Sequence, residues 1–248
     1  MRLIVTGVGD AFSAKHFGSS GLLEVDGGLF AIDCPGHVLG MYRAASASSG
    51  RQIDPARIMD IILTHLHGDH SNGLETIGFA HKHLYQSRER PRLHAIPEVL
   101  ERVWEKLAPA MDGRGRGSNE DLETYFQPCP MTEDAPVRIG PLEVRCRRTK
   151  HAVPTAGLMI SDGEVTLGWS SDCQFEQAHI DWLAPADLIV HECGEQAMHA
   201  RWDELDTLPD AIKAKMRLIH IPDDITLPSG PMRPLAEGEV LELSNIRG

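Results

Sequence analysis

The sequence predicts a single α/β domain over residues 1–248, and three observations lead to this prediction. Apolar runs of strand length alternate with helical segments in two successive series. No repeat of fixed period, low-complexity segment or linker separates the two series. With 248 residues, of which 42% are hydrophobic, the chain is long enough and apolar enough to close a core.

The first series begins with strands. Residues 2–7 and 22–33 are expected to be extended, and Asp26-Gly27-Gly28 indicates a hairpin turn within the second range. Asp54-Pro55 predicts the start of a short helix, because aspartate caps a helix and proline suits its first turn. The segment DIILTH at residues 60–65 then predicts a strand.

A helix and a long loop complete the first series. Residues 97–108 predict a helix because five apolar side chains share one face, namely Val99, Leu100, Val103, Trp104 and Leu107. From residue 109 to about 135 the periodicity ends among Gly, Asp, Pro and Arg, which indicates a loop or lid. Arg114 and Arg116 in this stretch could clasp a phosphate or carboxylate of a substrate, or belong to a solvated loop.

The second series has the same alternating character. Strands are expected at 142–147, 157–161, 165–169, 187–192 and 217–221, with helical segments near 175–184 and 203–215.

Charge and cysteine content narrow the classes of partner. The chain carries 36 acidic and 24 basic residues, a formal charge of −12, so a nucleic-acid polymer is not expected as its ligand. No apolar run reaches the roughly 20 residues that span a bilayer, and the N-terminal segment lacks the pattern of a signal peptide. The five cysteines show no C-x-x-C spacing, which favours a reduced, cytoplasmic protein, although the pairing of two of them stays open.

One short stretch, ILTHLHGDHSNG at residues 62–73, concentrates metal-binding side chains behind an apolar strand. His65, His67, Asp69 and His70 lie within six positions, and burying them is costly unless something compensates them. A metal ion is the natural compensator. Further donors follow later strands, namely His151, Asp172 and His220, and strand ends at one sheet edge are where α/β folds place their sites.

The seven donors indicate which metals the site would suit and how many ions it would hold. Imidazole and carboxylate suit zinc, iron or manganese, and no thiolate is needed. Seven ligands are too many for one tetrahedral ion and suit two ions that share a bridging group. We therefore expect two divalent metal ions, zinc above all, with iron or manganese as alternatives.

The stretch His65-Leu66-His67-Gly68-Asp69-His70 resembles the H-x-H-x-D-H motif of the metallo-β-lactamase superfamily. The later single donors recur in the order of that family, in "KHAVP" (His151), "SSDC" (Asp172) and "LIHIP" (His220). The resemblance covers essentially the whole chain. It implies an αβ/βα four-layer sandwich of two mixed β-sheets, with a dinuclear site at one edge.

The resemblance also implies a role for each donor. One metal ion would be held by three histidines, His65, His67 and His151. The other would be held by Asp69, His70 and His220, and Asp172 would bridge the two. Asp33, in "AIDCPG", would orient a ligand imidazole.

The segment from 187 to 224, beginning DLIVHECGEQAMHARW, resembles the ribonuclease Z-like branch of the superfamily. By this resemblance, His199 would be the general acid for the leaving group and Glu192 would orient it; the alternative for His199 is a surface histidine at a helix start. His191 is expected to be a buried imidazole outside the ligand set. His151 and Asp172 are only 21 positions apart, which leaves no room for the tRNA-gripping arm of that branch.

The sequence therefore predicts a metal-dependent hydrolase of a small molecule. The leading substrate is a small phosphodiester or cyclic nucleotide, attacked by a metal-bridging hydroxide that Asp69 would aim. The alternatives are a carboxylic ester, lactone or thioester hydrolase, and a di-iron oxygen-binding or redox protein. Tyr42, Tyr85 and Tyr125 all lie outside the second-half motifs, which disfavours a lactonase. A homodimer is left open.

Overall fold

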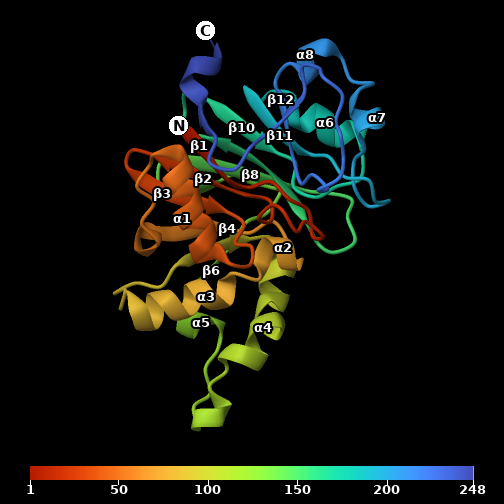
Figure 1. Ribbon diagram of the computed structural model, residues 1–248. Helices are drawn as coiled ribbons and strands as arrows, with labels where there is room; N and C mark the ends of the chain where they lie inside the picture. Colours follow the sequence, from red (N-terminus) through yellow and green to blue (C-terminus); the bar gives the residue numbers. More distant parts are fainter. Residues whose placement is uncertain (248) are drawn as a thin grey trace.

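The computed structural model describes residues 1–247 as two β-sheets packed face to face, with helices on the outer faces (Figure 1). From edge to edge, the first sheet consists of β14 (Val240–Glu242), β1 (Arg2–Gly7), β2 (Ser20–Val25), β3 (Gly28–Ile32), β4 (Ile58–Ile62), β5 (Arg92–Ala95) and β6 (Gln127–Pro130). The second consists of β13 (Arg233–Pro234), β12 (Met216–Ile219), β11 (Leu188–Glu192), β10 (Thr166–Trp169), β9 (Ala156–Ser161), β8 (Leu142–Arg148) and β7 (Val137–Ile139). Both sheets are mixed, so the structure confirms the predicted four-layer sandwich.

Helices and helical turns connect the strands. Those of the first half are α1 (Val38–Ser49), η1 (Pro55–Arg57), α2 (Gly68–Ser71), α3 (Leu74–Phe79), η2 (Ala80–Leu84), α4 (Pro97–Met111), η3 (Arg114–Arg116) and α5 (Leu122–Tyr125). Those of the second half are α6 (Gln177–Leu183), α7 (Trp202–Leu205), α8 (Asp210–Lys213) and η4 (Leu243–Arg247). In Figure 1, the chain from α4 through η3 extends away from the sandwich.

The main core lies between the sheets and is continuous across them. Leu22 and Ile61 of the first sheet belong to the same buried cluster as Leu158 and Trp169 of the second. A smaller cluster fills the outer face of the second sheet beneath α6 and α7, with Leu183, Ile189, Leu205 and Leu218 among its members. Because the sheets share one core, we keep the proposal that residues 1–248 form a single domain.

Several predicted elements have the expected cause. The Asp54 side chain accepts a hydrogen bond from Ala56 N at 3.0 Å and so caps η1. The predicted helix at 97–108 buries Val99, Val103 and Leu107 and continues as α4 to Met111.

Two sequence expectations need correction. Residues 109–135 are not simply a loop, because they contain η3, α5 and the edge strand β6. The sequence of β6, QPCP, hides this strand, since proline lacks the N–H of a central strand and is tolerated at a sheet edge. The predicted helical stretch at 203–215 is two short helices, α7 and α8, separated by residues 206–209, the last of which is Pro209.

Strand direction determines where the donors meet. β3 and β4 are parallel, and so are β10, β11 and β12. β8 is antiparallel to β9, which is antiparallel to β10, so β8 and β10 run in the same direction. Within each sheet, the loops that follow these strands therefore emerge at the same edge, and the donors from the two sheets lie close together there.

Candidate metal centre

The loop after β4 carries four of the predicted donors and is held by neighbouring backbone and side chains. Ser71 Oγ donates to the carbonyl of His67 at 2.7 Å, which closes the short helix α2 around the loop. Lys106 Nζ, from α4, donates to the Leu66 carbonyl at 2.8 Å and to Ser71 Oγ at 2.6 Å. Gly18 approaches this loop so closely that a Cβ there would lie 2.2 Å from the carbonyl oxygen of Asp69.

The structure brings all seven predicted metal donors together as two groups. The first group is His65, His67, His151 and Asp172, and the second is Asp69, His70, Asp172 and His220; within each group the donor atoms lie within 4.8 Å of one another. Asp172 belongs to both groups. Its position between them is what a bridging carboxylate requires.

Distances around Asp172 show how closely the two groups approach. Its Oδ2 lies 3.6 Å from Nε2 of His65 and 3.4 Å from Nε2 of His220. Its Oδ1 lies 3.3 Å from Nε2 of His70. Asp69 Oδ2 lies 3.2 Å from the same nitrogen of His70 and 3.2 Å from Nε2 of His220.

The chemistry of the donor set fits divalent metal ions. The Nε2 atoms of His65 and His70 are buried and have no hydrogen-bond partner, which is costly for a ring nitrogen. Nε2 of His151 and Nδ1 of His67 lie 3.1 Å apart, and a cation between such nitrogens would use both lone pairs. The residues present therefore suit a metal of the zinc, iron or manganese type.

Burial and neighbouring charges shift the pKa values of the candidate donors. Burial lowers the pKa of His65 well below its ordinary value and that of His151 to about 4, so both imidazoles are neutral near pH 7. Burial alone would raise the pKa of the Asp172 carboxyl, but His220, His70 and His65 outweigh it and hold that pKa well below its usual range. Burial disfavours charge on His70 and His220 as well, but the nearby carboxylates, Asp172 first, outweigh it and raise the pKa of both imidazoles, so a cation at this centre would replace their protons.

Asp33, the residue expected to orient a ligand imidazole, forms a hydrogen bond with His70. Its Oδ2 accepts a hydrogen bond from Nδ1 of His70 at 2.8 Å, which leaves Nε2 of that ring facing Asp172. Asp33 also accepts from the backbone N–H and the hydroxyl of Thr64, at 2.8 and 2.9 Å. Thr64 Oγ1 lies 3.0 Å from Nδ1 of His65. One buried carboxylate thus orients His70 directly and His65 through Thr64.

Backbone strain accumulates at this centre. Asp33, Ser171 and His220 have φ values of 62°, 56° and 59°, in the left-handed region that costs a side-chain-bearing residue about 1 kcal/mol or more. Asp33 and His220 directly follow β3 and β12, and Ser171 lies two residues after β10, so all three are at the start of a loop after a strand. Strain retained at three such positions is typical of a functional site.

The predicted pair of Glu192 and His199 lies beside the second donor group. Glu192 Oε2 is 2.8 Å from Nδ1 of His199, and the His199 ring stacks on that of His220 with centroids 4.8 Å apart. Glu192 is fully buried, and its other oxygen accepts from the backbone N–H of Cys173. Burial raises the pKa of Glu192 well above its ordinary value, and the Asp172 carboxylate raises it further. The contact therefore places a buried carboxyl group on Nδ1 of His199.

The structure also locates His191, the two arginines of η3 and the five cysteines. His191 is buried, and its Nδ1 donates to the backbone carbonyl of Glu192 at 2.7 Å, outside both donor groups. Arg114 and Arg116 lie in η3 and pair with Asp112 and Glu120 at 3.2 and 3.9 Å, and neither lines the two cavities that contain donors. All five cysteines are free. In the described part of the chain, no helix has the length and apolarity needed to cross a membrane.

Three residues that contact the donors or their loop could not be identified from the sequence. Thr64 is an ordinary strand-end residue, and Lys106 lies in an amphipathic helix 40 positions after its acceptor Leu66. The Met198 carbonyl accepts from Nδ1 of His151 at 3.2 Å, an interaction made by backbone that any residue could supply.

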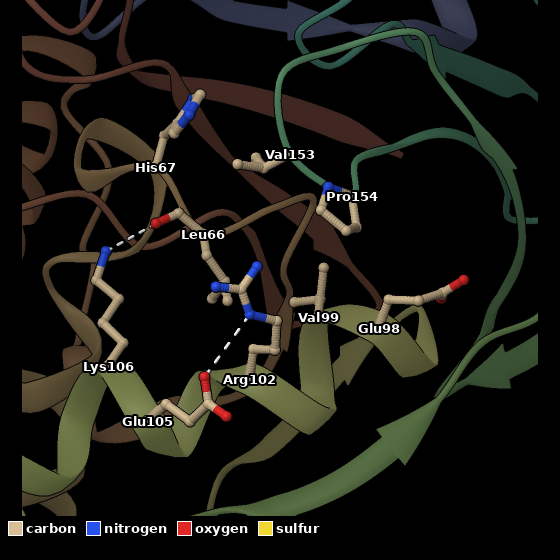
Figure 2. Close-up of a pocket in the computed structure, with 9 residues that line it drawn as sticks. All are labelled: Leu66, His67, Glu98, Val99, Arg102, Glu105, Lys106, Val153 and Pro154. Atoms are coloured by element: carbon tan, nitrogen blue, oxygen red, sulfur yellow. Dashed lines mark hydrogen bonds and ion pairs between the residues drawn. The ribbon is translucent and has the colours of Figure 1, made fainter.

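Two cavities open beside the donors. One, of about 410 Å³, is lined by donors from both groups, by His199 and by the apolar side chains of Phe12 and Met198. The other, of about 350 Å³, shares His67 with it and lies between α4 and the loop that contains Val153 (Figure 2). Figure 2 shows Lys106 reaching from α4 to the Leu66 carbonyl along one side of this second cavity.

Comparisons with known proteins agree with this fold. The short form of human tRNase Z aligns with a TM-score of 0.72 at 18% identity, covering 98% of this chain and 99% of that one. The metallo-β-lactamase fold protein YhfI of Bacillus subtilis aligns with a TM-score of 0.75 at 18% identity, covering 97% of this chain and 98% of that one. These likenesses confirm the superfamily resemblance at the level of the fold.

Sequence comparisons are more specific. The anti-Pycsar protein Apyc1 of Paenibacillus sp. (strain J14) is 29% identical over 237 residues, which cover 91% of each chain. The family model described as anti-Pycsar protein Apyc1 matches residues 1–231. Because that match spans nearly the whole sequence, the chain belongs to the anti-Pycsar protein Apyc1 family.

Proposed function

We propose that this protein is a metal-dependent hydrolase that opens the phosphodiester ring of a cyclic nucleotide. Water adds to phosphorus, one ribose oxygen leaves with a proton, and the product is the linear nucleoside monophosphate. The observation that carries the proposal is the contact of buried Glu192 with partly buried His199, 2.8 Å apart, beside the two donor groups that share Asp172. Membership of the Apyc1 family favours a cyclic nucleotide among small phosphodiesters.

Two divalent ions, zinc above all, are proposed for the centre. His65, His67 and His151 would hold one, Asp69, His70 and His220 the other, and Asp172 would contribute to both. When bound, such ions supply hydroxide near neutral pH and neutralise negative charge that develops on the phosphate. The two donor groups and the position of Asp172 support this number, because one ion cannot use all seven side chains.

Asp69 has a second proposed role beside ligation. One of its oxygens lies within 3.2 Å of both His70 and His220. Its other oxygen can accept a hydrogen bond from the attacking water and so orient it. The side chain lines the 410 Å³ cavity, where a substrate would enter.

His199 is proposed as the general acid. Glu192 occupies its Nδ1, which leaves Nε2 to give a proton to the departing ribose oxygen. Glu192 is the positioning residue, because its carboxyl group holds the ring through Nδ1 and directs Nε2 toward the cavity. An alkoxide is a poor leaving group, so proton delivery at this point removes a large part of the barrier.

The cavity and the charge of the chain favour a small substrate. A volume of about 410 Å³ is within the range that holds one small ligand. The formal charge of −12 repels an extended polyanion beyond the site itself. A lactone, ester or thioester is less favoured, because none of the three tyrosines is among the residues lining this cavity.

The test is direct hydrolysis by purified, metal-loaded protein. We expect 3′,5′-cyclic AMP, GMP, CMP or UMP to yield the linear monophosphate, resolved by ion-exchange chromatography. The Asp69→Asn variant should retain much of its metal yet lose turnover, since an amide ligates weakly and cannot hold the water's proton. Protein that leaves every cyclic nucleotide intact but hydrolyses a lactone or thioester would establish the alternative function.

A further inference from the structure

Phe12 is an exposed aromatic side chain at the mouth of the candidate metal centre. It is 80% exposed, and Leu84 is the other large hydrophobic residue that is similarly exposed in the described part of the chain. Phe12 lines the same 410 Å³ cavity as Asp69, His151 and His199. A ring left in water at the entrance to a site is a ready surface for a flat ligand.

The loop that carries Phe12 is held in place by Asp223. One oxygen of this carboxylate accepts from the backbone N–H groups of Ala14 and Lys15, at 2.8 and 3.1 Å, and the other accepts from the Ser13 hydroxyl. Lys15 Nζ returns a hydrogen bond to the Asp223 carbonyl at 3.1 Å. Asp223 lies three residues after the donor His220, so the loop is anchored to the segment that leaves the metal centre.

The base of the loop is tied to the same segment. Gly9 pairs with Ile221, and the Ile221 N–H donates to the Val8 carbonyl at 2.9 Å. A Cβ at Gly9 would lie 2.6 Å from Cβ of Ser13, so glycine is needed for the loop to fold back over itself. Phe12 therefore has a defined position relative to His220, although its ring is in solvent.

From these contacts we propose that Phe12 is the stacking platform for the nucleobase of the substrate. This assignment rests on the proposed function and names the part of the cyclic nucleotide that the aromatic ring receives. A base stacked on Phe12 would leave the cyclic phosphate on the donor side of the shared cavity. Stacking accepts every base, because each has a π face, but it favours the larger purines. Phe12 is thus a substrate-positioning residue and takes no part in proton transfer.

The experiment compares two substrates that differ only in the base. One is 3′,5′-cyclic AMP, and the other is methyl β-ribofuranoside 3′,5′-cyclic phosphate, which has the same ring phosphate and no base. Phe12→Ala should lower kcat/KM for cyclic AMP about 5- to 30-fold, chiefly by raising KM. The same variant should change kcat/KM for the base-free substrate by less than about twofold, and Phe12→Trp should restore the preference for cyclic AMP.

Two control variants separate stacking from other effects. Leu84→Ala removes the other exposed large hydrophobic side chain and should leave both substrates unaffected. Arg102→Ala alters the second cavity, which shares His67, and should not change the preference for the base.

The outcomes distinguish failure of the stacking role from failure of the proposed function. Equal losses on both substrates in Phe12→Ala, or no loss on either, overturn the assignment while the proposed function stands. Loss of the base preference in Arg102→Ala alone places the base in the second cavity and also overturns it. Wild-type protein that hydrolyses neither substrate overturns the proposed function, and the stacking role with it.

Discussion

Glu192 and His199 come from different elements and meet 2.8 Å apart, with the carboxylate fully buried and the imidazole at the cavity wall. Glu192 ends β11, whereas His199 lies in the turn before α7. Because Glu192 is buried, removing its carboxyl group or its partner has consequences that exposed pairs do not show. The first prediction tests what this pair does.

His199→Ala should slow substrates with poor leaving groups far more than those with good ones. A ribose alkoxide needs a proton to depart and p-nitrophenolate does not, and general acid catalysis contributes about 10²–10⁴-fold. Rates are measured with 3′,5′-cyclic AMP and with bis-p-nitrophenyl phosphate, with metal content determined for each preparation. Glu192→Gln should show the same pattern more mildly. Equal losses on both substrates would assign His199 to metal binding or folding instead.

Asp172→Ala should cost more metal than the loss of any ligand that serves one group. Asp172 lies in both donor groups, and without its carboxylate two cations would face each other with no negative charge between them. We expect about two metal ions per wild-type chain and a loss of at least one in the variant, measured by elemental analysis after dialysis. His151→Ala, which belongs to the first group alone, is the matched control. Zero metal in the reconstituted wild type would contradict the dinuclear centre.

Lys106→Met should loosen the donor loop without touching a donor. Methionine has a similar length but cannot donate to the Leu66 carbonyl or to Ser71 Oγ, so both acceptors lose a partner. We expect the free energy of unfolding to fall by about 1–3 kcal/mol, with weaker zinc binding, measured by denaturant titration and chelator competition. Arg102→Met, on the same helix and paired with Glu105 at 3.7 Å, should stay within about 0.5 kcal/mol. Equal effects of both changes would argue against an anchoring role for Lys106.

The contacts that buried Asp60 makes with Arg92 and His94 should make stability depend on pH. Asp60 on β4 accepts from Arg92 at 2.6 Å and from His94 at 2.8 Å, both on β5. Burial alone would raise the pKa of Asp60, but these bonds outweigh it and lower that pKa below its ordinary value. The stabilisation is therefore present above about pH 4 and is lost as pH falls below it, where an unfolded aspartate takes up its proton.

Asp60→Asn should accordingly lower the free energy of unfolding by about 1–3 kcal/mol at pH 7, and the difference from wild type should narrow below about pH 4. Chemical denaturation of the two proteins at several pH values checks this. A difference that stayed constant down to pH 3 would mean that the Asp60 charge contributes nothing to stability.

The sequence by itself determined the candidate donors and most of the strands that present them. The motif at residues 65–70 combines ligand spacing with a preceding apolar strand, and each pattern is local enough to recognise in one dimension. The strands that precede His151, Asp172 and His220 were likewise evident from short apolar runs. Elements whose own sequence argues against them were not: β6 contains two prolines and is a strand only because the edge of the sheet tolerates them.

Only the tertiary structure decided which of these side chains meet. Asp33 and His70 lie 37 positions apart and hydrogen-bond because parallel β3 and β4 end at the same edge. Lys106 reaches the donor loop, and Asp223 anchors the loop of Phe12, through contacts that no spacing in the sequence encodes. The physical reason is the separation along the chain over which each pattern extends. Periodicity and ligand spacing involve residues only a few positions apart. Strand direction, register and side-chain packing join residues far apart in the chain, and they exist only once both sheets have closed around the shared core.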